Sequence, residues 1–223
     1  VHGRPADEVL RVARAAGATQ VHATEDFTPY GVDRDATTAK ALAEHDIDLV
    51  HTGSAYAVSP GRITKDDGTP YKVFTPFFRA WGDHGWRDPA PAVRDVSWLR
   101  PEGRTHRIPD VAVPDGVTLP PIGEAAARRR WRDFLDEDVA GYDEQRDLPG
   151  ADRTSRMSVH LKWGTIHPRT MLADLREHRA GGTAEGVDAY ARELAFRDFY
   201  ADVLHHRPDS ATDYYDATFA RME

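Results

Sequence analysis

The chain of 223 residues carries 29 Lys and Arg against 37 Asp and Glu, a net charge of −8, which argues against a simple cationic nucleic-acid binder but is compatible with a local basic groove. Hydrophobic residues make up 40% and charged residues 30%, as in globular proteins, and no apolar run reaches the roughly 18 residues that a membrane span needs. The chain has no cysteine, which excludes disulfides, thiolate chemistry and cysteine metal sites and agrees with a cytoplasmic protein.

The first part of the chain alternates helix and strand patterns. Residues 5–16 space their apolar side chains as a short amphipathic helix does, and Gly17 is placed to end that helix. A short strand is expected at 19–23, a second helix at 33–45 and a second strand at 47–51. This alternation predicts a parallel α/β sheet with right-handed crossovers.

The stretch 25–35 joins the first expected strand to the second expected helix. Ligands of open α/β sheets bind at such strand ends, so this stretch is a candidate wall of a pocket. The simpler interpretation, which we favour, is a capped helix start with Asp33 or Asp35 at the N-terminus of the helix.

Aromatic and proline-rich segments follow. The Asp-Gly pair at 67–68 indicates a tight turn between extended segments. We assign Phe77, Phe78 and Trp81 in the next segment to the core in preference to a base-stacking platform. Residues 89–122 are rich in proline and lack periodicity, which predicts a linker between domains.

Helical patterns occupy the rest of the chain. One face of the first expected helix is apolar and comprises Ala127, Trp131, Phe134 and Leu135. The arginine run at 128–130 is a candidate phosphate contact, but a solvated helix face is the favoured interpretation. We therefore predict an α/β domain at 1–88 and an all-α domain at 123–223.

Hydroxyl and cationic side chains gather at the start of another predicted helix. They are Arg153, Thr154, Ser155, Arg156 and Ser158. Free N–H groups and the positive end of the helix dipole make such a start a candidate anion site, to which hydroxyls and arginines add donors. From these residues alone, simple capping of the helix is the favoured alternative.

A long periodic stretch at 187–204 carries four chemically active side chains on one face. Glu193, Phe196, Arg197 and Tyr200 follow the i, i+3, i+4, i+7 spacing. The simpler alternative is an ion pair between Glu193 and Arg197, worth a few tenths of a kcal/mol. Periodicity alone favours that alternative.

Three blocks of this chain resemble the DNA photolyase and cryptochrome family. TSRMSVHLKWGTIHPR (154–169) resembles the family's flavin-binding signature, and RELAFRDFY (192–200) resembles its E-L-x-W-R-E-F-Y block. TPYKVFTPFFRAW (69–81) resembles the segment that closes its N-terminal domain. The resemblance covers nearly the whole chain. It implies an α/β antenna-binding domain and an all-α FAD-binding domain, both incomplete here.

The resemblance implies a class I cyclobutane pyrimidine dimer photolyase. Such an enzyme uses reduced, anionic FAD to repair DNA in light, and a second antenna chromophore, folate or deazaflavin, assists it. The expected partner is DNA that contains pyrimidine dimers, and the expected state is a monomer in the cytoplasm. Two alternatives stay open: a cryptochrome-like blue-light photoreceptor without repair activity, and a non-catalytic nucleotide-binding α/β module.

The resemblance also assigns roles to the face at 187–204. Glu193 matches the carboxyl group that hydrogen-bonds the dimer and is the expected catalytic residue; a carboxyl group here favours the cyclobutane class. Arg197 matches a cation close to both flavin and DNA. Phe196, on the DNA side, and Tyr190, on the flavin side, stand where the family usually has Trp, and Tyr200 is an expected DNA contact.

Further upstream, Tyr142 and Arg146 match the family's Y-x-x-x-R-(D/N)-x-P motif. The resemblance gives the Tyr a flavin contact and the Arg a DNA phosphate, where it would position the duplex without reading sequence. The alternative is a surface turn. The flavin's phosphates and ribityl chain are expected at Thr154, Ser155, Arg156, Met157 and Ser158.

Overall fold

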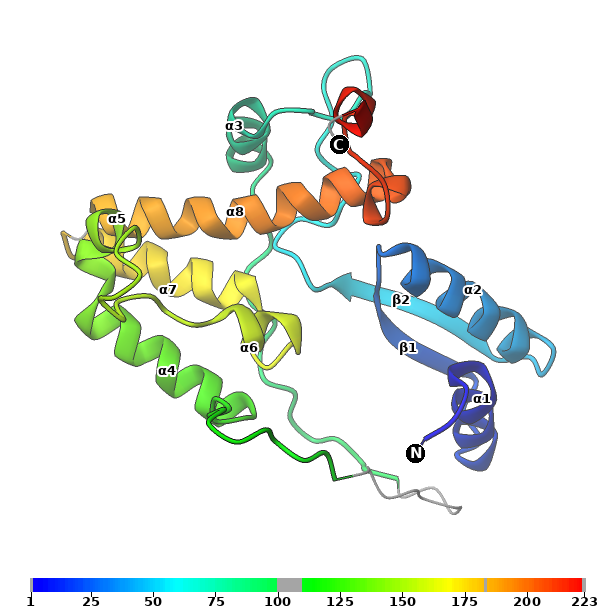
Figure 1. Cartoon of the computed structure of the whole chain (residues 1–223). Coiled ribbons are helices and arrows are strands. Elements are labelled where there is room, and N and C mark those ends of the chain that lie inside the picture. Colours follow the sequence, from blue (N-terminus) through cyan, green and yellow to red (C-terminus); the bar gives the residue numbers. More distant parts are fainter. Residues whose placement is uncertain (1, 100–109, 183, 222–223) are drawn as a thin grey trace. The chain divides into compact units, whose positions relative to one another are not determined.

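The computed structural model describes residues 2–99, 110–182 and 184–221 (Figure 1). It separates into two compact units. The first unit comprises Val1–Ser54 and Pro91–Leu119, and the second comprises Ala55–Ala90 and Pro120–Glu223. The domain boundaries that the sequence suggests stay a prediction. None of the described helices combines the length and the apolarity that crossing a membrane requires.

The first unit has the α/β order that the sequence predicts. Its elements are α1 (Pro5–Ala15), β1 (Gln20–Glu25), α2 (Pro29–Ala43) and β2 (Asp48–Ser54). The two strands pair in parallel with Gln20 opposite Asp48, which confirms the expected parallel sheet. Ala13, Leu42 and Ile47 form a small buried cluster in this unit.

The start of α2 differs from the sequence prediction. The helix begins at Pro29, because Thr28 accepts a hydrogen bond from the Gly31 N–H at 3.1 Å and Pro29 suits the first helical position. The expected cap at Asp33 or Asp35 was therefore wrong. Asp35 lies inside α2 and is buried.

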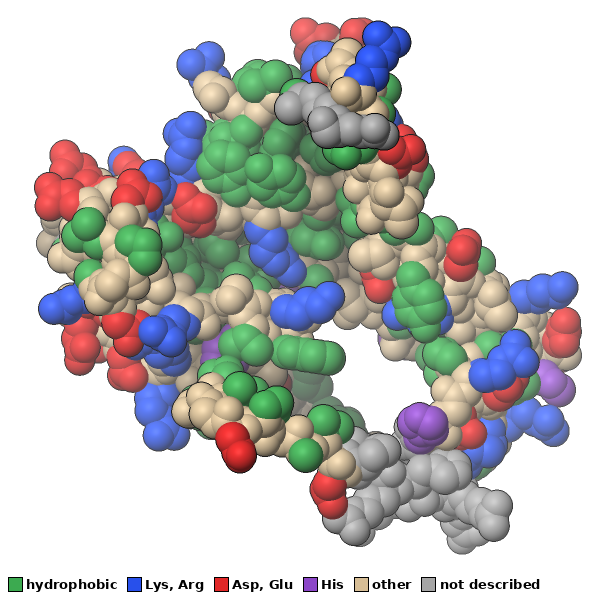
Figure 2. Space-filling model, viewed as in Figure 1, with side chains coloured by type: hydrophobic (Ala, Val, Ile, Leu, Met, Phe, Trp, Pro, Cys, Tyr) green, Lys and Arg blue, Asp and Glu red, His purple; other side chains and the backbone are tan. Residues whose placement is uncertain are grey.

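The second unit is helical and is organised around one long helix. Its elements are α3 (Phe74–His84), α4 (Glu124–Glu137), α5 (Tyr142–Gln145), α6 (Ser158–Lys162), α7 (Pro168–Ala180) and α8 (Ala184–His206), with short 3₁₀ helices at Val139–Gly141, Pro208–Ala211 and Ala217–Arg221. Helix α8 contacts α3, α5 and α7, and Figure 1 shows it between α3 and α7. Figure 2 shows hydrophobic side chains at the surface where α3 meets α8.

Several predicted features of this unit are confirmed. The residues buried on α4 are Ala127, Trp131, Phe134 and Leu135, as its periodicity indicates. The turn at 67–68 closes with a hydrogen bond from the Gly68 N–H to the Lys65 carbonyl, and Gly68 has a φ of 78°. Phe77 and Trp81 are buried and Phe78 packs against the same core. In the proline-rich stretch, most of which belongs to the first unit, the described parts 89–99 and 110–122 contain no helix or strand, and its role as a linker between domains stays a prediction.

Two buried carboxylates on α8 hold the segment that follows β2. Asp198 accepts hydrogen bonds from the Val58 N–H at 2.9 Å and from the Trp81 indole N–H at 3.0 Å. One turn further along α8, Asp202 accepts from the Gly61 N–H at 2.7 Å. Both carboxylates are almost fully buried, and hydrogen bonds are what makes such burial tolerable. The backbone of residues 55–61 is thereby attached to α8.

The protonation of Asp198 is expected to make stability depend on pH. Burial raises the pKa of Asp198 to about 6, from an ordinary value of 3.8, against the opposing effect of the hydrogen bonds that Asp198 accepts. Between these values the folded state binds more protons than the unfolded state, so the contribution of Asp198 to the free energy of unfolding rises as pH falls from about 7 to about 4. We expect the free energy of unfolding of the wild type, minus that of Asp198→Asn, to increase by an amount on the order of 2 kcal/mol as pH falls over this range. Urea denaturation at several pH values measures it. If this difference in the free energy of unfolding did not change with pH, the raised pKa of Asp198 would be contradicted.

Candidate functional site

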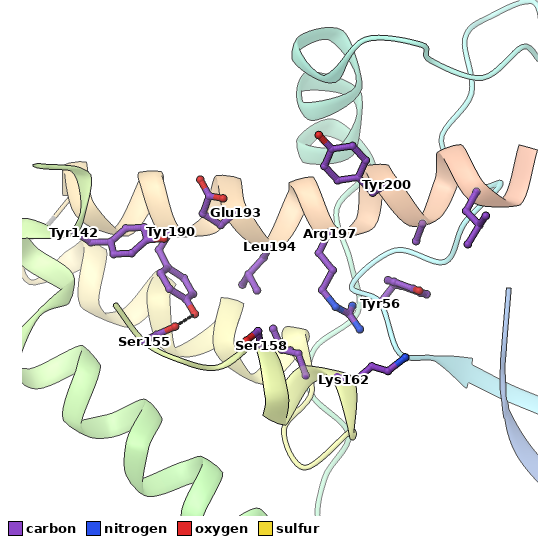
Figure 3. A pocket seen from close by; sticks show the side chains of 13 residues that line it. Tyr56, Tyr142, Ser155, Ser158, Lys162, Tyr190, Glu193, Leu194, Arg197 and Tyr200 are labelled. Atoms are coloured by element: carbon purple, nitrogen blue, oxygen red, sulfur yellow. Dashed lines mark hydrogen bonds between the residues drawn. The ribbon is translucent and has the colours of Figure 1, made fainter. Parts of the chain in front are cut away.

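A cavity of about 610 Å³ opens along α8 in the second unit (Figure 3). The residues of its lining that the sequence analysis singled out are Tyr142, Ser155, Ser158, Tyr190, Glu193, Arg197 and Tyr200. They come from α5, from α6 and the segment before it, and from α8. Segments separated by tens of residues thus supply one lining, which mixes aromatic rings, hydroxyls, a carboxylate and a guanidinium.

The face of α8 that lines the cavity differs from the one that the sequence suggests, because it leaves out Phe196. Glu193, Arg197 and Tyr200 share it, as their spacing indicates. Phe196 lies outside the lining and stacks on Phe74 of α3, with 3.4 Å between the ring centroids and 10° between the ring planes. Successive helix residues turn by about 100°, so Phe196 stands at the edge of the face, where α3 covers it.

The ion pair of Glu193 also differs from the simple alternative. Glu193 accepts a hydrogen bond at 2.7 Å from Nη1 of Arg146, so the expected pairing with Arg197 was wrong. Arg197 donates to the carbonyl of Ala55 at 2.8 Å, and its guanidinium lies 4.5 Å from the centre of the Tyr56 ring. Both side chains thus bind residues that are distant in the sequence instead of binding each other.

A hydrogen bond between hydroxyls closes the α5 end of the cavity. The hydroxyl of Tyr190 and Oγ of Ser155 are 2.6 Å apart, and Figure 3 shows the two side chains pointing toward each other. The rings of Trp131, Phe134 and Tyr142 pack around Tyr190, with centroids 5.0 to 5.2 Å away. Burial raises the pKa of both Tyr142 and Tyr190, so these phenols stay protonated at neutral pH.

Removing the Tyr190 hydroxyl tests this contact. Tyr190→Phe is expected to lower the free energy of unfolding by about 1 kcal/mol, because it leaves the buried Ser155 hydroxyl with only the long contact from the Met157 N–H at 3.3 Å. Tyr200→Phe is the matched control, since Tyr200 is 64% exposed. Equal effects of the two substitutions in urea denaturation would contradict a specific role for the hydrogen bond.

The predicted position of the helix start at residues 153–158 was wrong. Helix α6 begins only at Ser158 and has 5 residues. The preceding segment is held as a loop by Arg130 of α4, which donates to the carbonyls of Thr154 at 2.6 Å and Ser155 at 3.0 Å. These carbonyls are bound from outside their own segment, so the hydroxyl and arginine pattern forms a loop instead of an anion-binding helix end. For Arg130, the favoured interpretation of the run at 128–130 as a solvated helix face was wrong, because its side chain binds these two carbonyls.

Only part of the expected flavin-binding segment lines the cavity. Ser155 and Ser158 do so. Thr154 is exposed outside the lining, and Arg156 is exposed with a φ of 55° and pairs with Asp152 at 2.6 Å. Met157 is 1% exposed and belongs to the hydrophobic core.

Among the other lining residues, two that carry polar groups were missed by the sequence analysis. Lys162 lies four residues after Ser158 on α6, and Figure 3 shows it close to Arg197. That i, i+4 spacing was visible in the sequence and is the signal that could have identified Lys162. Tyr56 lies in the segment after β2, far from α8 in the sequence, and no local pattern connects it with Arg197.

Comparisons with known proteins show what the chain resembles. The family model described as DNA photolyase matches residues 1–94. The chain is 34% identical to deoxyribodipyrimidine photo-lyase of Streptomyces griseus, over 95% of this chain and 47% of that protein. It is 33% identical to the Halobacterium salinarum protein of the same name, over 97% of this chain and 47% of that protein. The chain thus spans about half the length of these curated relatives.

Other matches extend the comparison. An uncharacterized 31.6 kDa protein of a Synechococcus strain is 30% identical, over 89% of this chain and 73% of that protein. A class III photolyase from Agrobacterium tumefaciens superposes with a TM-score of 0.80 at 22% identity, over 99% of this chain and 48% of that chain. A Synechocystis cryptochrome superposes with a TM-score of 0.72 at 19% identity, over 91% of this chain and 45% of that chain. These two structures share the fold, and the sequence matches lead to one statement: the chain is similar to deoxyribodipyrimidine photo-lyases over nearly its whole length, and its residues 1–94 match the DNA photolyase family model.

Proposed function

We propose that this protein is a deoxyribodipyrimidine photo-lyase that uses FAD and light to split cyclobutane pyrimidine dimers in DNA. The observation that carries the proposal is the shared lining of one cavity. The side chains that the family resemblance assigns to flavin or substrate meet there, and they are Tyr142, Ser155, Ser158, Tyr190, Glu193, Arg197 and Tyr200. Relatives at 33 and 34% identity carry this enzyme name.

The chemistry of the lining fits part of an FAD molecule. Its volume of about 610 Å³ lies in the range of roughly 300 to 1,000 Å³ that is usual for small-molecule sites. Ser155 and Ser158 offer hydroxyls for a ribityl chain or a phosphate, and Lys162 and Arg197 offer positive charge. Bound FAD would supply the light-driven electron transfer that splits the cyclobutane ring.

The chain's own residues then hold and orient the reacting groups. Tyr190 keeps the Ser155 hydroxyl in place through the 2.6 Å contact. Arg197, fixed by the Ala55 carbonyl and the Tyr56 ring, places a positive charge beside an anionic flavin or phosphate. Glu193 would accept a hydrogen bond from the imide N–H of a flipped pyrimidine.

The finer assignments belong to the same proposal. The FAD is reduced and anionic when active, and a folate or deazaflavin serves as antenna. The substrate is DNA containing pyrimidine dimers, and Arg146 contacts a phosphate beside the dimer. Thr154, Arg156, Met157 and Phe196 keep their proposed flavin or DNA contacts only through backbone groups or through rearrangement, because their side chains lie outside the cavity. The protein acts as a monomer in the cytoplasm.

A repair assay tests the proposal. The protein with reduced flavin is mixed with an oligonucleotide that contains one thymine dimer, and thymine absorbance is followed in light and in the dark. Light-dependent recovery of absorbance is the expected result. No recovery with reduced flavin demonstrably bound would replace repair by a photoreceptor function, and a protein that binds an adenine nucleotide but no flavin would favour the nucleotide-binding module.

A further inference from the structure

The ion pair between Arg146 and Glu193 joins two residues that the proposed function assigns to different parts of the substrate. Nη1 of Arg146 donates to Oε1 of Glu193 at 2.7 Å, and the side chains are 34% and 41% exposed. Glu193 lines the cavity, whereas Arg146 lies just outside it at the end of α5. The inference below rests on the proposed function, in which Glu193 binds a base and Arg146 binds a phosphate.

The pair makes the two binding events depend on each other. While Arg146 is paired, Nη1 is occupied and the carboxylate offsets the positive charge, so a phosphate has to compete with Glu193 for the guanidinium. The displaced carboxylate would then face the negative DNA backbone without its partner, which is unfavourable. A flipped pyrimidine removes this cost, because its imide N–H gives Glu193 a new partner inside the cavity.

The surroundings of Arg146 oppose phosphate binding as well. Asp147 lies 3.9 Å from Nε of Arg146, so two carboxylates act on one guanidinium. The first turn of α5 carries the acidic residues Asp143 and Glu144. Figure 2 shows acidic side chains gathered where Figure 1 places α5. Undamaged DNA, which offers phosphates but no flipped base, therefore meets a site with little free positive charge.

We infer that Glu193 is a specificity-determining residue, which keeps Arg146 from the phosphates of undamaged DNA and releases it when a flipped pyrimidine engages the carboxylate. Discrimination then arises from a penalty on the wrong ligand in addition to contacts with the right one. A residue that only bound the dimer would leave the affinity for undamaged DNA unchanged when it is substituted.

The substitution Glu193→Gln separates the two roles. Glutamine keeps the size of the side chain and an acceptor for the imide N–H, but it has no charge to hold Arg146. The affinity for undamaged duplex is expected to rise about two- to fivefold, the range that partly exposed ion pairs are worth. The slope of log affinity against log salt should steepen by up to about 0.9, one phosphate contact.

The measurement is fluorescence anisotropy in the dark, with one labelled duplex prepared undamaged and with a single thymine dimer. The variants are Glu193→Gln, Arg146→Gln, the double variant and the control Asp147→Asn, which removes a carboxylate near Arg146 outside the cavity lining. Glu193→Gln should gain more affinity for undamaged duplex than Asp147→Asn, and the gain should vanish in the Arg146→Gln background. A misfolded variant cannot mimic a gain in affinity.

Three results would overturn the inference: no gain for undamaged duplex, a gain no larger than that of Asp147→Asn, or a gain that persists without Arg146. The wild type separates this failure from that of the proposed function. A wild type that prefers the dimer duplex while Glu193→Gln gains nothing overturns the inference alone. A wild type that binds both duplexes equally overturns the proposed function together with the inference.

Discussion

Replacing Glu193 by alanine is expected to weaken binding of dimer-containing DNA at least tenfold and to slow its repair in limiting light. The proposed hydrogen bond between the carboxylate and the imide N–H involves a charged group, and such bonds are worth roughly 1.5 to 3 kcal/mol, or about ten- to a hundredfold in affinity. The effect should appear in anisotropy titrations with the dimer duplex and in the initial rate of thymine recovery.

Glu177→Ala is a suitable control for the loss of one negative charge. Glu177 is exposed on α7, outside the cavity lining. This variant should bind and repair the dimer duplex like the wild type. If Glu193→Ala bound the dimer duplex as tightly as Glu177→Ala, the assignment of Glu193 to the substrate would be wrong.

Replacing Gly186 by alanine is expected to lower the free energy of unfolding by about 3 kcal/mol. Gly186 is buried on α8, where it packs against the turn at residues 139–141, and an added Cβ would overlap the carbonyl oxygen of Val139 and lie 3.1 Å from the Ala140 backbone. The atoms that the new methyl group would meet belong to the backbone of the turn and not to a flexible side chain. The methyl group can therefore be accommodated only if α8 moves away from the turn. Urea denaturation of the purified variant measures the effect.

Gly82 offers the matched control for this substitution. It lies in α3 with open space around the position of an added Cβ among the described residues. Gly82→Ala should be neutral or stabilise the fold by about 0.5 to 1 kcal/mol, because alanine restricts the unfolded chain more than glycine does. If both variants lost a similar free energy of unfolding, the close approach of the backbone at Gly186 would not be the cause of the destabilisation.

The features that the sequence predicts well depend on local periodicity. The apolar face of α4 repeats every three to four residues, and all of its predicted members are buried. The parallel pairing of β1 and β2 follows from the alternation of strand and helix patterns, because a strand, a helix and a second strand connect in few ways. In the site, the shared face of Glu193, Arg197 and Tyr200 follows from helical spacing alone.

The features that the sequence analysis missed depend on partners far away in the chain. The pattern at 153–158 satisfies the requirements of a helix start, but Arg130 binds two of its carbonyls and stabilises a loop. Phe196 carries an aromatic ring at the right spacing, yet its direction is decided by Phe74 of α3. No window of local sequence contains both members of either pair. The start of α2 is different, because the Thr-Pro pair at 28–29 is a local signal for a helix start.

The attachment of residues 55–61 to α8 has a consequence for how the family's sequences vary. Asp198 and Asp202 bind main-chain N–H groups, which every residue type except proline provides. Co-variation between positions reports contacts in which one side chain must adjust to another. A carboxylate that binds the main chain has no such counterpart, so statistical coupling of Asp198 with Val58 and of Asp202 with Gly61 should be weak although the contacts are close.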